Sequence, residues 1–397
     1  MQHSAVRTLA LLGLAGSIAL TGCGSSSKSG TGLGAASSSS STGGASGATV
    51  KIGFEGPLTG DNAQLGLNEV QAVEVAIDQA NKANTYGFQV QLVKADDVGL
   101  ADKAPAAAAT LQQDPAILGV IGPSFSGASA AVGASYDTAG LVLVSPSATN
   151  PTLTSKGFKS FHRVVPPDSL EGLEAADWLA KKAKKVYVID DGTDYGKGAA
   201  DAVQAELKVK AITTTRDSVP QATTDYSVIS QKVASSGADA LFYGGYDTQA
   251  GLFAKGLTAA GFKGLTMTGN GGKSTKFTTA AGSSGDGWYF SCGCLDATVA
   301  PVAKAFNDAY KAMFKVDSST YSPEAYDATN LLLTAIKNAG ASPTRKSVWD
   351  AVNTVDYKGI TNDLKFTSTG EVAAQLINLY QQKSGAIALL GDIKSQS

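Results

Sequence analysis

Small hydroxyl and amide side chains gather directly after an apolar run in the segment "LVLVSPSATNP", residues 141–151. Ser147 and Thr149 carry hydroxyls there, Asn150 carries an amide, and a proline stands on each side. Such groups can simply close a polar turn after a buried strand. They can also donate hydrogen bonds to a ligand, because ligands of open α/β sheets bind beyond the carboxyl ends of the strands.

A second polar loop precedes this one in the chain. The apolar run "LGVIGP" is followed by Ser126, where the small-residue helix "SGASAAVGASY" is predicted to begin. Ser126 could simply be the N-cap of this helix. A helix start also offers free backbone N–H groups and the positive end of the helix dipole to an anion. If the two strands are neighbours, Ser147, Ala148 and Thr149 add backbone N–H groups and a hydroxyl. We therefore predict a site for one carboxylate-sized anion.

Aromatic residues follow other apolar runs. Tyr195 lies in "DDGTDYGKG" and Tyr246 in "FYGGYDTQ". Tyr246 comes after two glycines, which predicts a ring exposed on a loop rather than buried in a strand. Tyr243 and Trp288 are instead expected in the core.

The chain lacks the patterns of common catalytic sites. No G-x-S-x-G nucleophile elbow occurs. The segment "GNGGKST" resembles the end of a phosphate-binding loop, but Met267 stands where that motif needs glycine. His162 lies in the strand-like run "KSFHRVV" and is expected to be structural. We therefore predict a protein that is not an enzyme and that has no cofactor and no metal site.

Short apolar runs and helical stretches alternate from Thr49 onwards, beginning with "VKIGFEGP" and the helically spaced "NEVQAVEVAIDQANKA". This alternation predicts βαβ units and parallel sheets covered on both faces. About 350 residues follow the N-terminal segments, more than one core usually supports. The predicted fold is therefore α/β, with two doubly wound domains.

Two segments are typical of chain crossings between domains, "RVVPPDSLEG" and "GWYFSCGCLDATVAPVAKAF". Together with the element pattern they assign residues 49–165 and 298–369 to an N-terminal domain. Residues 166–297 and 370–397 are assigned to a C-terminal domain.

The N-terminal residues indicate export. One positive charge precedes the apolar stretch "TLALLGLAGSIAL", which is too short to span a bilayer, and "LTGC" follows it. This pattern predicts a lipoprotein signal peptide over residues 1–22 and lipidation of Cys23, although an ordinary secretory signal remains the alternative. Residues 23–48 are almost all Ser, Gly, Thr and Ala, which predicts a disordered tether.

Charge and cysteine content exclude several classes of partner. The formal net charge is −2 and the charges are scattered, which argues against binding of nucleic acid. Cys292 and Cys294 are two residues apart, so in a regular strand their α-carbons would lie near the upper limit for a disulfide. A bend at Gly293 would permit the bond, and both the bonded and the free form remain open.

Several of these segments together resemble the leucine/isoleucine/valine-type solute-binding proteins of ABC importers. They are the N-terminal lipidation pattern, "GPLTGDNAQLG", "VIGPSFSGAS", "LVSPSATNPTLT", "DYGKG", "YGGYDTQAG" and "PEAYDATNLLLTAI". The resemblance covers residues from about 50 to 390, and the quoted segments occur in the same order as in the family. It implies the type I periplasmic binding protein fold, in which three hinge strands join two domains and the ligand lies in the cleft.

The resemblance also implies roles for single residues. Ser126 and Thr149 would bind the α-carboxylate of an amino acid, and Ser147 would offer its carbonyl to the ammonium, next to Ala148. Tyr195 and Tyr246 would close over the ligand from the second domain. The implied partners are a small molecule and the permease and ATPase of an importer.

The sequence departs from the family at two positions. Asn270 stands where the family has an acidic partner for the ammonium, and Leu65 stands where it has an aromatic residue. Glu55 or Asp247 could supply the missing negative charge. The alternative function is a sensor of the same fold that binds an amide, urea or another small carboxylate.

The expected protein is a monomeric receptor on the outer face of the cytoplasmic membrane, attached through its lipid alone. It would capture an amino acid by closing its hinge.

Overall fold

The first sheet forms from short runs of Val, Ile and Leu, whose branched side chains pack well on a pleated surface. The computed structural model, which describes residues 48–373 and 376–396, orders its strands β2-β1-β3-β4-β5, all parallel. The strands are β1 (Thr49–Gly56), β2 (Gln89–Asp96), β3 (Ile117–Ile121), β4 (Val142–Ser145) and β5 (Phe161–Arg163).

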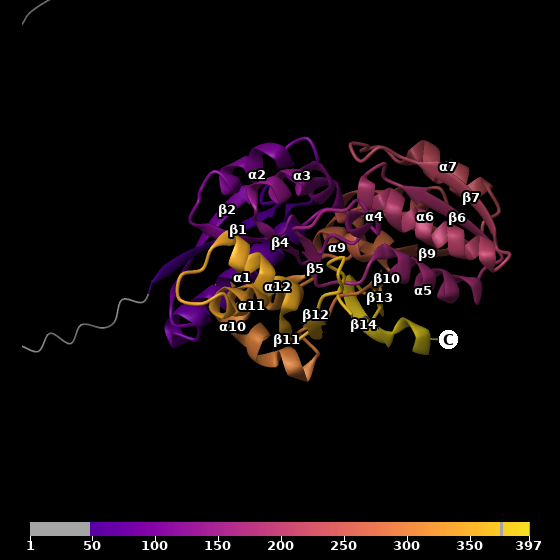
Figure 1. Ribbon diagram of the computed structural model, residues 1–397. Helices are drawn as coiled ribbons and strands as arrows, with labels where there is room; N and C mark the ends of the chain where they lie inside the picture. Colours follow the sequence, from indigo (N-terminus) through magenta and orange to yellow (C-terminus); the bar gives the residue numbers. More distant parts are fainter. Residues whose placement is uncertain (1–47, 374–375, 397) are drawn as a thin grey trace, which may run out of the picture. The chain divides into compact units, whose positions relative to one another are not determined.

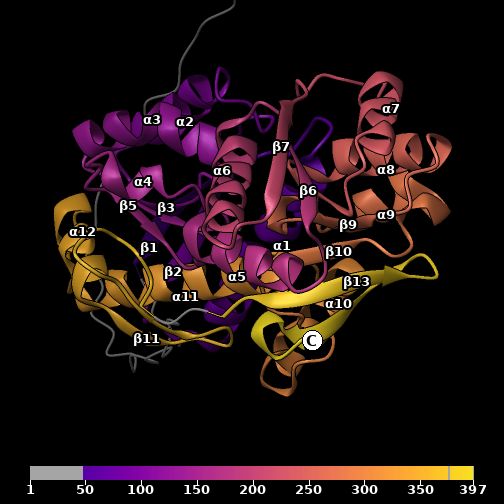
Figure 2. The same ribbon diagram turned by 90° about the vertical axis from the view of Figure 1, so that its right-hand side faces the viewer.

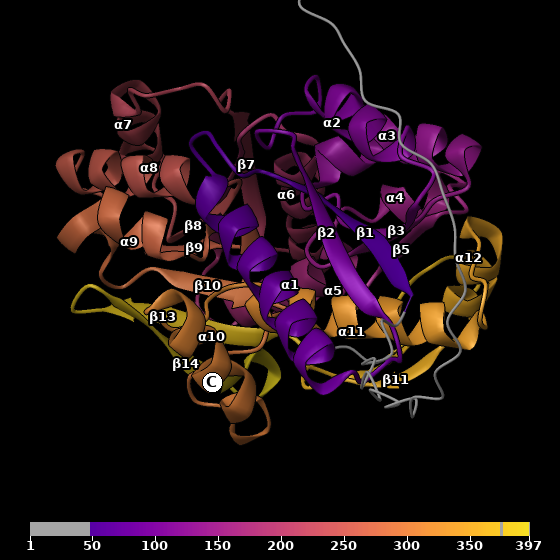
Figure 3. The ribbon, with the colours of Figure 1, turned by 90° about the vertical axis from the view of Figure 1, so that its left-hand side faces the viewer.

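Helices cover both faces of this sheet (Figure 1 and Figure 3). Because side chains alternate along a strand, Val120 and Leu143 belong to one core cluster and Ile121 and Val144 to the other. The helices of this domain are α1 (Ala63–Ala83), α2 (Ala104–Gln112), α3 (Ser126–Ala139), α4 (Thr152–Ser155), α10 (Lys304–Phe314), α11 (Ser322–Asn338) and α12 (Arg345–Thr354). A hairpin of β11 (Asp356–Lys358) and β12 (Asp363–Lys365) follows α12.

Segments far apart in the sequence therefore build one domain. The orange and yellow helices α10, α11 and α12 lie beside the indigo α1 and the first strands (Figure 3). Residues 304–365 lie within the region that the sequence analysis assigned to the N-terminal domain.

The second sheet has the order β14-β13-β10-β9-β8-β6-β7, in which β13 alone runs antiparallel to the other strands and pairs with β10 and β14 on its two sides. Its strands are β6 (Lys185–Asp190), β7 (Thr213–Ser218), β8 (Ala240–Gly244), β9 (Leu265–Thr268), β10 (Tyr289–Cys292), β13 (Asn378–Lys383) and β14 (Ala386–Asp392). Its helices are α5 (Asp168–Ala180), α6 (Asp194–Val209), α7 (Ser227–Ser235), α8 (Asp247–Ala259) and α9 (Thr275–Ala281), with a short 3₁₀ turn, η1 (Asn270–Gly272). Figure 2 shows α6 on one side of β7 and β6, and α8 and α9 on the other.

The chain passes between the two sheets three times. The first crossing joins β5 to α5, the second joins β10 to α10, and the third leads from the bridge between Phe366 and Val372 into β13. A Cβ on Gly293 would lie 2.1 Å from Cγ of Pro166, so the first two crossings touch and only glycine fits there. The carbonyl of Gly370 accepts a hydrogen bond from the Arg163 N–H, so residue 370 lies against the first domain before the chain enters the second.

The predicted signal peptide, Cys23 and most of the predicted tether lie outside the described residues. In the part of the chain that is described, we find no helix that is both long enough and apolar enough to cross a bilayer.

Candidate ligand site between the two domains

The two polar loops of the first domain begin at the same edge of its sheet. Strands β3 and β4 are neighbours, with Ile121 opposite Val144, so the condition set by the sequence analysis is met. Gly122 turns the chain after β3 with a φ of +116°, and a Cβ there would lie 2.2 Å from the Glu55 carbonyl oxygen. This turn directs the following loop toward the start of α3.

Ser126 is the first residue of α3 and does not cap it. Its hydroxyl instead accepts a hydrogen bond from the Asn150 N–H at 3.2 Å, which joins the two loops. The N–H of Ala148 donates to Ser145 Oγ at 3.1 Å, and the Ser147 hydroxyl donates to the Ser124 carbonyl at 2.6 Å. The backbone N–H of Ala148 is therefore already used inside the loop.

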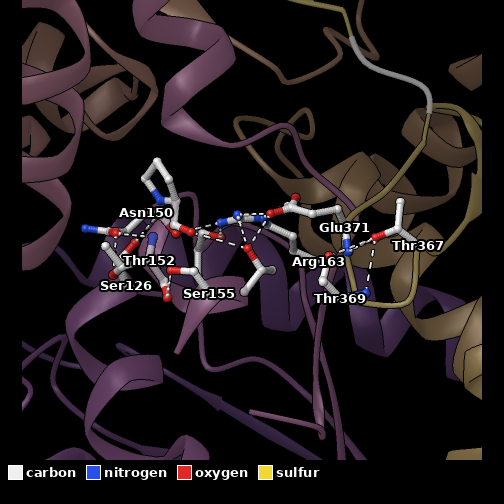
Figure 4. A network of polar contacts seen from close by, with 11 residues as sticks. Ser126, Asn150, Thr152, Ser155, Arg163, Thr367, Thr369 and Glu371 are labelled. Carbon is white, nitrogen blue, oxygen red and sulfur yellow. Dashed lines mark hydrogen bonds and ion pairs between the residues drawn. The ribbon is translucent and has the colours of Figure 1, made fainter. Parts of the chain in front are cut away.

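Arg163 supports the loop that carries Ala148 and Asn150 (Figure 4). Its side chain is fully buried and donates to the carbonyls of Ala148 at 3.1 Å and Asn150 at 2.9 Å. Its charge is balanced by Glu371, which accepts from Arg163 Nε at 2.8 Å and also forms an ion pair with the guanidinium. Five donors in a rigid fork suit such a support role. Sequence reasoning missed Arg163, because Glu371 lies more than 200 residues away.

Two unpaired polar groups meet beside this loop. The Thr149 hydroxyl and both carboxylate oxygens of Asp168 are buried and make no hydrogen bond of ordinary geometry with the described residues. The Asp168 N–H donates to the Thr149 carbonyl at 2.9 Å, so the two residues are held together. Burial raises the pKa of Asp168 to about 7, against the opposite influence of Thr149, Arg163 and Asn270. Such groups are candidates for ligand contacts, because buried polar atoms normally have partners.

Asn270 is held by a carboxylate rather than standing free. Its N–H and its side-chain amide donate to Glu171 at 2.9 and 2.6 Å, and Ser291 Oγ donates to the same carboxylate at 2.8 Å. Burial raises the pKa of Glu171 to about 8, and the nearby Asp168 raises it further. Both acids come from the first turn of α5. In the sequence they read as ordinary N-terminal helix residues, and no signal there distinguishes them.

Aromatic rings surround the space between these groups. The Tyr195 hydroxyl accepts a hydrogen bond from the Gly271 N–H at 2.9 Å, and Tyr246 stacks on Phe125 with ring centroids 4.2 Å apart. Tyr246 is only 4 % exposed, so the expectation of an exposed ring was wrong, since Phe125 of the opposite domain covers it. Tyr321, which the sequence analysis missed, adopts a left-handed φ of 68°, and its buried hydroxyl has no partner in the described chain.

A cavity of about 10 Å³ lies among these residues, and both domains contribute to its wall. Its lining comprises Leu65, Ser124, Phe125, Ser126, Ser147, Tyr195, Tyr246, Asn270, Gly271 and Tyr321. Five of the seven predicted binding residues line it, and the other two, Ala148 and Thr149, lie in the loop that forms its wall.

None of the four acids Glu55, Asp168, Glu171 and Asp247 lines this cavity directly. Glu55 accepts a hydrogen bond from Tyr136, and burial raises its pKa to about 8. Asp247 accepts from Asn62 Nδ2 at 2.8 Å and from Ser274 Oγ at 2.5 Å. Since Asn62 belongs to the first domain and Asp247 to the second, this pair connects the domains at the rim.

The remaining candidate residues are structural. A disulfide joins Cys292 and Cys294 at the second crossing, where the Cys294 carbonyl accepts from the Tyr380 hydroxyl at 2.8 Å. His162 is buried in β5, with Asn353 Oδ1 2.9 Å from its Nε2. Tyr243 and Trp288 are buried in the core as expected. Within the described residues, no group of three or more His, Cys, Asp or Glu side chains could hold a metal ion.

Comparison with known proteins supplies the family. The family model described as "Periplasmic binding protein" matches residues 49–386. This chain belongs to the periplasmic binding protein family. Members of the family are substrate-binding proteins that act outside the cytoplasm.

Relatives of this chain, and solved structures of similar proteins, agree with that membership. Leu/Ile/Val-binding protein homolog 3 of Brucella melitensis is 31% identical over 347 residues, which is 86% of this chain and 93% of the relative. A branched-chain amino acid transporter substrate-binding protein from Streptococcus pneumoniae, solved with isoleucine, is 26% identical with a TM-score of 0.77, covering 86% of this chain and 99% of that one. A leucine-binding protein from Thermotoga maritima, 24% identical with a TM-score of 0.80 over 86% of this chain and 97% of that one, shares the fold.

Proposed function

We propose that this protein captures an α-amino acid with a small aliphatic side chain in the cavity between its domains. It then delivers that ligand to the permease and ATPase of an ABC importer. The observation that carries the proposal is the pairing of opposite polar groups around one small cavity. Hydroxyls and a helix start stand on the first-domain side, and the carboxylates of Asp168 and Glu171 stand behind the second-domain side.

The carboxylate of the ligand is placed at the start of α3. Ser126 and Thr149 supply hydroxyls, and the first N–H groups of the helix add hydrogen-bond donors and the positive end of its dipole. The buried Thr149 hydroxyl, which makes no hydrogen bond of ordinary geometry with the described residues, supports this assignment. Charge-assisted hydrogen bonds in a closed cleft are stronger than neutral ones.

The ammonium of the ligand is assigned to Asp168 rather than to Asn270, Glu55 or Asp247. Asp168 is buried, and neither of its oxygens makes a hydrogen bond of ordinary geometry with another described residue. Glu171 already accepts three hydrogen bonds, so its part is to hold Asn270 and to add negative potential. A cation at Asp168 would offset the cost of burying its charge.

The aliphatic side chain would then contact Leu65, Phe125 and the tyrosine rings. This apolar wall and the relatives named above favour leucine, isoleucine or valine over polar amino acids. Binding residues come from both domains, so the ligand stabilises the closed arrangement, as in hinge closure. Lipidation at Cys23, attachment to the outer face of the membrane and a monomeric state complete the proposal.

The experiment is calorimetric titration of the purified full chain with leucine, isoleucine, valine, the other α-amino acids, small amides and urea. We expect micromolar or tighter dissociation constants for at least one branched-chain amino acid. If an amide or urea binds and every α-amino acid fails, the proposal is wrong and the sensor alternative replaces it.

A further inference from the structure

A second and larger pocket lies between the domains, directly outside the ligand cavity. Its volume is about 440 Å³, against about 10 Å³ for the inner cavity. Its first-domain wall is residues 99–101 with Phe125 and Gly127, and its second-domain wall is residues 191–194, Ser218, Pro220, Gln221 and Tyr246. Only Phe125 and Tyr246 line both spaces.

The Phe125–Tyr246 ring pair is therefore the partition between the two spaces. The ring centroids lie 4.2 Å apart at an interplanar angle of 20°, and both side chains are at most 4 % exposed. One ring comes from each domain, so the partition exists only when the domains are together. A ligand that extended past this plane would separate the rings and prevent closure.

The outer pocket carries negative charge. Asp191 and Asp194 line it, and no Lys, Arg or His is among its described lining residues. Asp191 is 1 % exposed, and its Oδ2 has no hydrogen-bond partner in the described chain, while Oδ1 accepts from the Thr193 N–H and hydroxyl. Helix α6 also starts at this pocket. Its first turn is already capped by the Thr193 hydroxyl, which accepts from Gly196 N, and the two carboxylates oppose its dipole.

We propose that the Phe125–Tyr246 pair sets the maximum length of the ligand side chain, and that the pocket beyond it accepts the positively charged end of a longer α-amino acid once one of the rings is removed. The native protein thus selects short side chains, because a long one loses the ring stack and the closed arrangement. Removal of one ring joins the two spaces and lets a cationic side chain reach Asp191 and Asp194. This inference rests on the proposed function, which places the α-amino acid head in the inner cavity.

The test compares the dissociation constants of leucine, of arginine and of 2-aminooctanoate, which has a long uncharged side chain. Each is measured for the native chain and for Phe125→Ala. Leucine should bind the native protein at least tenfold more tightly than arginine. In the variant the dissociation constant of arginine divided by that of leucine should fall at least tenfold. The dissociation constant of 2-aminooctanoate divided by that of leucine should fall less. Adding Asp194→Asn, which changes charge at an exposed side chain, should remove the extra gain of arginine.

Two further variants separate the partition from a mere gain of space. Leu100→Ala enlarges the outer pocket on a wall that the inner cavity does not share and leaves both rings in place, so its arginine-to-leucine ratio should change less than threefold. Tyr246→Leu opens the partition from the other domain and should reproduce the shift even if Phe125→Ala does not fold.

The outcomes distinguish the two proposals. If leucine binds and neither ring variant changes the ratio, or if Leu100→Ala changes it equally, the partition inference is overturned while the proposed function stands. If no α-amino acid binds any of these proteins, the proposed function fails and the inference fails with it.

Discussion

Replacing Asp168 with asparagine should abolish most amino acid binding while it stabilises the protein. Asparagine keeps the shape of the side chain and removes only its negative charge. Under the proposed function the ligand ammonium then enters a buried site without its counter-charge. Truncating one partner of a buried charge pair costs about 2–5 kcal/mol, so the dissociation constant should rise roughly 30- to 5,000-fold.

The effect on stability has the opposite sign. Burial raises the pKa of Asp168 from 3.8 to about 7, so between these pH values the folded protein retains a proton that the unfolded chain has lost. The free energy of unfolding therefore falls as the pH rises through this window, by about 4 kcal/mol in total. Asp168→Asn removes that penalty, so the free energy of unfolding at pH 7.5 without added amino acid should increase, by up to the same amount.

The same pKa predicts a pH dependence of binding. An ammonium ion favours ionised Asp168, so binding should release a proton below pH 7, and the native dissociation constant should be about tenfold higher at pH 6 than at pH 8. In Asp168→Asn the dependence attributable to this group should vanish, while Glu55 and Glu69, which do not face the cavity, continue to titrate.

The assay pairs isothermal titration at pH 6, 7 and 8 with urea unfolding of the same preparations. Glu55→Gln is a matched control, because it removes another buried carboxylate of raised pKa that does not line the cavity. A native-like dissociation constant for Asp168→Asn would refute the assignment of the ammonium. Loss of binding together with a large loss of stability would also refute it, because the residue would then be structural.

Three further changes test the site and its surroundings. Thr149→Val should weaken the binding free energy by about 1.5–3 kcal/mol, the range for a bond to a charged partner, and an unchanged titration would remove the hydroxyl from the site. Asn62→Ala removes a hydrogen bond to Asp247 across the cleft, so the dissociation constant of the ligand should rise about tenfold or more. Small-angle scattering of this variant with saturating ligand should still show the closed arrangement. Reducing Cys292–Cys294 should lower the free energy of unfolding by only about 1.5 kcal/mol, because the closed loop is so short, and a loss above 4 kcal/mol in denaturant titration with a reductant would contradict this.

The fold class and half of the site could be predicted from the sequence. Alternating apolar runs and helical periods are local patterns, so they predicted two α/β domains before any contact was known. The loops carrying Ser126 and Thr149 could also be found, because parallel strands end at a common edge and polar residues follow them.

The other half of the site depends on contacts that no local pattern contains. Asp168 and Glu171 look like ordinary first-turn acids until α5 buries them opposite Asn270, a residue about a hundred positions away. Tyr246 follows two glycines, and only the opposite domain buries its ring. The sequence by itself therefore determined which elements form and which strand ends carry polar groups. The tertiary structure decided which charges are buried without partners and which rings divide the cleft, because burial is a property of the packed chain and not of its segments.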